Sequence, residues 1–149
     1  MKTEDQDLLL KDLCGRLPYW VKCIVKSDGY VGVISSIESQ YGVVTFDDGR
    51  QEEICDIKPC LYPLSSMTEE QNKILIKNYH FSFNSCSDGI TNGIYSPTFN
   101  RTIYYSMDED DISKIIDWLN KNHFDYRGLI EKGLAIDATG LNIYKEEIK

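Results

Sequence analysis

Apolar and polar positions follow two different periods along the chain, and the change of period divides it into segments. Leucines from Leu9 to Leu17 recur at helical spacing, which predicts an amphipathic helix over residues 3–16 that ends near Pro18. From residue 19 to 62 the period is two, as in strands with one buried face. Turn residues divide that stretch into four or five short strands, over residues 21–26, 30–38, 41–46, 50–57 and 60–62.

The second half of the chain returns to helical patterns. Ser66 and Glu69 have capping-box spacing and predict a linker helix within residues 64–78. Residues 80–105 hold short β-rich runs separated by turns. A strongly amphipathic helix is predicted over 108–123, and a short helix over 126–132, capped by Asp125, ends at Gly133. Residues 134–136 add an edge strand.

These elements predict an α+β fold with two regions. Residues 1–63 form a helix followed by a small, bent antiparallel β-barrel, and residues 64–149 form an α+β region. The run Val43–Leu61, VVTFDDGRQEEICDIKPCL, resembles SH3-like and Tudor-like small barrels, in which an Asp-Asp-Gly hairpin precedes a closing Lys-Pro segment.

That resemblance implies a binding module for peptides, modified side chains or nucleic acid, with the ligand on aromatic surface. Five aromatic residues are candidates for this surface, and the alternative is that they fill a small core or its rim. They are Tyr19, Trp20, Tyr30, Tyr41 and Tyr62.

Charge and cysteine usage narrow the function classes. The formal charge of −8 argues against non-specific nucleic-acid binding, because phosphate affinity depends on a surplus of Lys and Arg. None of the five cysteines has Cys-x-x-Cys spacing, so no zinc site is predicted, and no cofactor motif is found. The chain has no stretch apolar enough to span a bilayer and no signal core at its N-terminus, which predicts a cytoplasmic protein with free thiols.

A polar cluster near the C-terminal end of the long helix is the second candidate site. His123, Asp125, Tyr126 and Arg127 combine a proton-exchanging imidazole with a guanidinium that could hold a carboxylate or phosphate. The alternative is structural: Asp125 caps the last helix, Arg127 pairs with a nearby acid, and Tyr126 and Phe124 pack under the turn.

Three blocks in order along the chain, LLLKDLCGRLPY, IKPCLYPLSSMTEEQ and DWLNKNHFDYRGLIEKGLAI, resemble a family of small proteins from gut bacteria and their prophages and mobile elements. The resemblance implies a cytoplasmic, phage-linked setting and carries over no catalytic residue. Trp20 departs from the family pattern, in which glycine is expected at this position.

The first functional hypothesis is therefore a binding module that contacts a protein partner, such as a host protein, without turnover. A hydrolase-like enzyme that uses His80 or His123 with Asp125 and Arg127 is the alternative, although no catalytic motif is present. A nucleic-acid-binding barrel is the third. The oligomeric state stays open.

Overall fold

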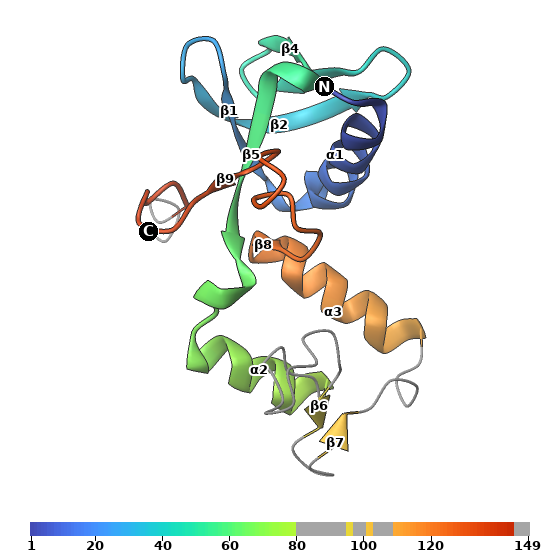
Figure 1. Cartoon of the computed structure of the whole chain (residues 1–149), viewed down its shortest axis with the longest axis vertical. Coiled ribbons are helices and arrows are strands. Elements are labelled where there is room, and N and C mark those ends of the chain that lie inside the picture. The colour runs from blue at the N-terminus through green and yellow to red at the C-terminus, as the bar shows by residue number, and fades with distance from the viewer. Residues whose placement is uncertain (80–94, 97–100, 103–108, 145–149) are drawn as a thin grey trace. The chain divides into compact units, whose positions relative to one another are not determined.

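A computed structural model describes residues 1–79, 95–96, 101–102 and 109–144, with side chains for residues 1–79 and 112–144 (Figure 1). The chain divides into two compact units. The first joins Met1–Pro63 with Leu119–Lys149, and the second is Leu64–Trp118. Residues 119–149, which the sequence pattern grouped with the C-terminal region, thus belong to the same unit as the N-terminal strands.

The first unit begins with helix α1 (Thr3–Arg16), as predicted, followed by a 3-10 turn, η1 (Leu17–Tyr19). Leu9 and Leu13 are fully buried on one face of α1, four residues apart, as helical spacing requires. Figure 1 shows α1 alongside the strands of this unit. The helix therefore covers a sheet and supplies part of its core.

Five strands follow. The first four form a meander, and the fifth, which comes after a 3-10 turn, η2 (Ile54–Asp56), pairs with the first. Neighbouring strands pair antiparallel in the order β4-β3-β2-β1-β5. Burial alternates along β1 and β3, which agrees with the period of two in the sequence. The strands are β1 (Lys22–Val25), β2 (Val31–Glu38), β3 (Val43–Phe46), β4 (Gln51–Glu53) and β5 (Ile57–Pro63).

Two short strands from the C-terminal segment extend the sheet to seven strands. β8 (Phe124–Asp125) and β9 (Ile136–Asp137) both pair parallel with the second half of β5. The α+β class is confirmed, but the predicted closed barrel is not, because the sheet is open, with β4 and β8 at its ends. The second half of β5 pairs with the C-terminal segment.

The core of the first unit lies between α1 and the sheet. It gathers residues from α1, from the strands and from the segment after β8, so its burial depends on chain parts that are far apart in sequence. Each fully buried Leu or Ile contributes about 1.5–3 kcal/mol. The members are Leu9, Leu13, Val21, Cys23, Val25, Ile34, Val44, Phe46, Ile54, Ile57, Leu61, Leu129, Leu134 and Ala135.

The second unit contains helices and a short hairpin. A capping box precedes α2, but it is formed by Thr68 and Gln71 and not by Ser66 and Glu69: the Gln71 N–H donates to Thr68 Oγ1, and the Thr68 N–H donates to Gln71 Oε1. The elements are η3 (Leu64–Ser66), α2 (Glu69–Tyr79), β6 (Tyr95–Ser96), β7 (Arg101–Thr102) and α3 (Glu109–Lys121), the end of which belongs to the first unit.

None of the helices in the described ranges combines the length and the apolar character needed to cross a bilayer.

Candidate functional site

Asp125 holds the turn that follows β8. Its Oδ1 accepts the backbone N–H of Leu129 and its Oδ2 accepts that of Ile130, both at 2.9 Å. The side chain is buried. Both carboxylate oxygens are therefore engaged by backbone donors, although these belong to a turn and not to the helix that Asp125 was predicted to cap.

The prediction of a short helix over residues 126–132 is wrong. Residues 129–133 form a turn, with hydrogen bonds from the Gly133 N–H to the Ile130 carbonyl and from the Leu134 N–H to the Leu129 carbonyl. Gly128 and Gly133 adopt positive φ, which ends helical geometry at both sides of this segment. The chain then enters β9, close to the edge strand predicted at residues 134–136.

A buried ion pair lies beside this turn. Arg16 Nε donates to Asp12 Oδ2 at 2.7 Å and Arg16 Nη2 to Asp12 Oδ1 at 3.1 Å, and both side chains are fully buried. Arg16 Nη2 also donates to the Phe124 carbonyl at 2.6 Å, which joins the end of α1 to β8. Arg127, partly exposed, places its Nε 3.5 Å from Asp12 Oδ1.

Tyr126 completes this arrangement. The Cζ atoms of Arg16 and Arg127 lie 5.3 and 5.2 Å from its ring centroid, within cation–π range. Its hydroxyl donates to Asn120 Oδ1 at 2.9 Å, and Asn120 is buried. We call Asp12, Arg16, Asn120, Tyr126 and Arg127 the buried network. Sequence reasoning missed Asp12 and Arg16, although their spacing of four residues beside Leu9 and Leu13 was a usable signal.

His123 is held by packing against the C-terminal segment. Its ring stacks on Tyr144 with centroids 3.8 Å apart and an interplanar angle of 10°. The Tyr144 hydroxyl donates to the Cys60 carbonyl at 2.7 Å and accepts the Lys22 N–H at 3.0 Å, and burial raises the pKa of Tyr144 well above its ordinary range. His80, the proposed partner of His123 in a hydrolase-like site, lies outside the described residues.

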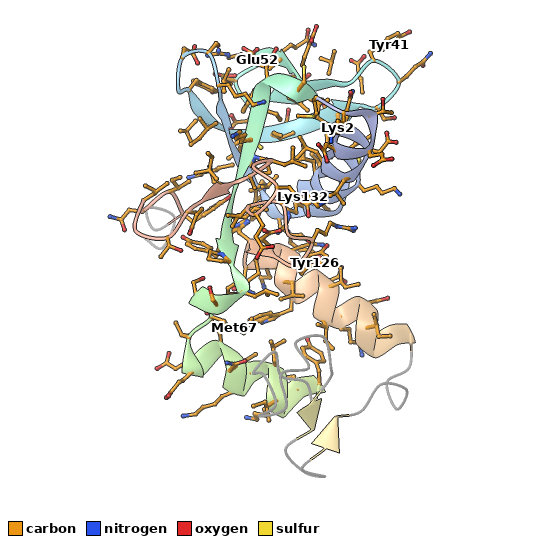
Figure 2. The ribbon with its side chains drawn as sticks, in the orientation of Figure 1. Lys2, Tyr41, Glu52, Met67, Tyr126 and Lys132 are labelled. Atoms are coloured by element: carbon orange, nitrogen blue, oxygen red, sulfur yellow. The ribbon has the colours of Figure 1, made fainter. Side chains whose placement is uncertain are left out.

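The five candidate aromatics fall into different surroundings. Trp20 and Tyr41 are exposed to similar extents, 69% and 70%, whereas Tyr19, Tyr30 and Tyr62 are half-buried. Tyr62 packs near Phe124 and Tyr144, with ring centroids 6.4 and 6.0 Å away. Figure 2 shows Tyr41 on the loop between β2 and β3. Of the five, Trp20 and Tyr30 line adjoining hollows in the surface.

These two hollows meet at Val33 and Asp47, which line both of them. The first, about 620 Å³, is bounded by η1 and β2, with Leu17, Trp20 and Ile34 in its wall. The second, about 600 Å³, is lined by residues 30–33, by Lys22 and by the turn at residues 141–143. We call the two hollows together the β2 groove. Both hollows are wide open to solvent.

Trp20 adopts an unusual backbone conformation at one end of the β2 groove. Its φ and ψ angles are 56° and 47°, in the left-handed region that glycine occupies without strain. A residue with a Cβ is destabilised there by about 1–2 kcal/mol. Glycine would adopt this conformation without strain, whereas tryptophan adopts it at a cost.

The other end of the groove is held by an ionic network between two loops. The Tyr30 hydroxyl donates to Asp48 at 2.5 Å, and Arg50 donates to Asp28 and to Glu52, both at 2.8 Å. The hydrogen bond from Tyr30 lowers the pKa of Asp48, and the Tyr30 N–H and Arg50 lower that of Asp28. The Tyr30 hydroxyl is thus engaged inside the chain.

Asp47 lies between these features and is exposed. Its N–H donates to the Val33 carbonyl at 2.9 Å, but its carboxylate forms no hydrogen bond or ion pair with any residue that the structure describes. Among the described residues it is therefore a carboxylate without a direct ion-pair partner, and it lines both hollows.

A small cluster at η2 places one thiol sulfur and two carboxylate groups within 4.8 Å of one another. Its members are Glu53, Cys55 and Asp56. The Cys55 thiol lies 3.5 Å from Glu53 Oε2, and burial together with this contact raises the pKa of Cys55. Exposed acidic groups often gather in this way without a metal ion, so the cluster by itself does not define a site.

The sequence-predicted residues are therefore not brought together in one place. His123, Asp125, Tyr126 and Arg127 hold the C-terminal segment in position, while Trp20 and Tyr30 line the β2 groove. No family model, curated protein or solved structure matches this chain.

Proposed function

We propose that the protein is a binding module that holds a segment of a partner protein in the β2 groove and acts by contact, without turnover. The observation that carries this proposal is Trp20. The residue is 69% exposed, it borders a hollow of about 620 Å³, and its backbone is strained. Strained residues of this kind concentrate at ligand-binding and active sites.

Trp20 also has the chemistry of a binding residue. Tryptophan supplies a large rigid contact area and is enriched among the residues that dominate binding energy. Leu17 and Val33 provide apolar surface next to it. An apolar side chain of a partner segment would gain burial against these residues while losing little conformational entropy from the module.

The remaining candidate residues support binding over catalysis. Asp125 is engaged by two backbone N–H groups, and Arg127 lies beside a buried aspartate. Neither is placed as an acid, a base or an anion clamp among the described residues. The carboxylate of Asp47 within the groove disfavours a polyanionic ligand such as nucleic acid.

The strand order supports a relation to SH3-like small barrels, although the sheet is open. β5 returns to pair with β1 after the 3-10 turn η2, so the fifth strand lies beside the first strand of the meander. Such folds mostly serve as binding modules. From the family resemblance, we further propose that the partner is a host protein met in the cytoplasm of a cell that carries a prophage or mobile element.

A peptide-display selection with a matched pair of variants tests the proposal. Random peptides are selected on the full chain, and the best is titrated by calorimetry against the wild type, Trp20→Ala and Tyr41→Ala. Tyr41 is as exposed as Trp20 but lines neither hollow. We expect Trp20→Ala to weaken binding by about tenfold or more and Tyr41→Ala to leave it unchanged. Failure to select any peptide, or equal losses in both variants, would overturn the proposal.

A further inference from the structure

One edge of β2 pairs with β1 along residues 30–34. The hydrogen bonds between the two strands identify which backbone groups of β2 point toward β1. The Val25 N–H donates to the Tyr30 carbonyl at 2.8 Å, and the Ile34 N–H donates to the Val21 carbonyl at 3.2 Å. Between them, Gly32 is opposite Cys23. Since hydrogen-bonded and non-bonded pairs alternate in antiparallel strands, the N–H and C=O groups of Val31 and Val33 face away from β1.

On that other side, β2 has a partner only from Ile34 onward, where its pairing with β3 begins opposite Phe46. The Asp47 N–H reaches the Val33 carbonyl, and there the hairpin turns away. The Val31 N–H, the Val31 carbonyl and the Val33 N–H therefore have no partner among the residues that the structure describes. They form a short free strand edge in the middle of the chain's main sheet.

This free edge opens onto the β2 groove. Residues 30–33 and Asp47 line the second hollow, of about 600 Å³, and Val31 is 42% exposed. An unpaired edge with exposed side chains is a template on which an extended segment adds as a further strand. Backbone hydrogen bonds then supply affinity, and alternate side chains supply specificity.

The structure assigns a specific kind of occupant to this edge. We infer, resting on the proposed function, that the partner segment binds in extended form, as a strand that pairs with β2 at Val31 and Val33. It places an apolar side chain against Trp20 and a basic side chain against Asp47.

Charge favours a basic partner segment over a second copy of the chain as the occupant of this edge. The chain carries a net charge of −8, and the carboxylates of Asp28, Asp47 and Asp48 lie around this end of the groove, where Arg50 is already engaged by Asp28 and Glu52. A second acidic copy would bring like charges together, which is unfavourable. A segment with Lys or Arg meets the carboxylate of Asp47.

The other exposed strand edge is a poorer site. β4 ends the sheet and carries Glu52 and Glu53 in its three residues. Charged side chains on an edge strand hinder the addition of another strand. The added strand is therefore expected at the internal edge of β2 and not at β4.

Two measurements on the selected peptide test the added strand. The first methylates the peptide's backbone nitrogens one at a time, which removes each N–H donor. We expect losses of about tenfold at alternate positions only, because every second residue of an added strand faces β2. The second follows hydrogen exchange of the Val31 and Val33 amides, which should slow by about tenfold or more on binding, while the Gln40 amide in the β2–β3 turn stays unchanged.

The outcomes separate this inference from the proposed function. A peptide that needs Trp20 but tolerates every N-methylation, and leaves the Val31 amide unprotected, overturns the added strand and leaves the binding module intact. If no peptide depends on Trp20, both fall. If sedimentation of the free protein shows a dimer with a protected Val31 amide, the edge is occupied by a second copy and the inferred partner segment is wrong.

Discussion

In the buried network, Asp12, Arg16 and Tyr126 hold one another inside the first unit, whereas in the β2 groove Trp20, Val31 and Asp47 face solvent. Both places combine aromatic rings, charge and backbone polar groups. They differ in what those groups have as partners. The network uses them to join α1 to the segment after β8, and the groove leaves them open to a ligand.

Because of this difference, a high density of reactive residue types in a sequence is a weak guide to the position of a functional site. His123 to Arg127 has the richest chemistry in the chain, yet its described contacts are internal. The comparison leads to a clear expectation. Changes in the network should alter stability and leave binding alone, whereas changes in the groove should alter binding.

The largest effect is expected from Asp12→Ala. It leaves the fully buried Arg16 guanidinium without its carboxylate, which should lower the free energy of unfolding by about 3–5 kcal/mol, as measured by urea denaturation. Replacing both partners with leucine removes the charge as well and should recover most of this loss. Peptide binding by the folded protein should stay unchanged. If the double variant is as unstable as Asp12→Ala, the ion pair is not the cause.

Next in size is the contrast between Trp20→Ala and Trp20→Gly. Both should weaken peptide binding by about tenfold or more, because both remove the ring. Only glycine relieves the positive φ, so Trp20→Gly should be more stable to urea than Trp20→Ala by about 1 kcal/mol. Equal stabilities would show that the backbone at this position is not strained.

A smaller effect is expected from Asp47→Asn. The loss of one exposed carboxylate should weaken binding of a basic peptide by about twofold to fivefold, and the loss should fade at high salt. Asp7→Asn, on the exposed side of α1, makes the same change in net charge outside the groove. Calorimetry at two salt concentrations compares them. Equal effects of the two variants would assign the attraction to overall charge.

The smallest effect concerns the loops beside the groove. The Tyr30 hydroxyl lowers the pKa of Asp48, so the stabilisation is complete above the pKa of an unfolded aspartate and is lost as the pH falls through the lower folded value. Tyr30→Phe should therefore raise the pKa of Asp48 in an NMR titration. Asp137, whose pKa is lowered by Thr139, is the control and should not move. An unchanged Asp48 would exclude this hydrogen bond in solution.

Local pattern was enough to predict α1, the four strands of the meander and the long helix α3, because each shows its period over several residues. It could not predict β8 and β9, which have two residues each and exist only through their register with β5. The same limit explains the barrel: whether a sheet closes depends on which distant segment pairs with β5.

The candidate site was predictable only in part. Trp20 and Tyr30 were predicted because of their aromatic rings. The free edge at Val31 and Val33 depends on which residues of β2 form hydrogen bonds with β1, and the side-chain pattern does not indicate this. Asp47 was seen as a hairpin residue because Asp-Asp-Gly is a turn signal. Its missing ion pair is a property of the folded surroundings.

The hydroxyl of Tyr144 bonds to the carbonyl of Cys60, and this has a consequence for how the protein emerges from the ribosome. Residues 1–63 leave the exit tunnel first, but their partner strands and Tyr144 are translated later. At about 5–20 residues per second, the roughly 80 intervening residues take roughly 4–16 s. Until β8, then β9 and finally Tyr144 have been made, the second half of β5 lacks these partners, so this edge of the nascent chain stays uncovered.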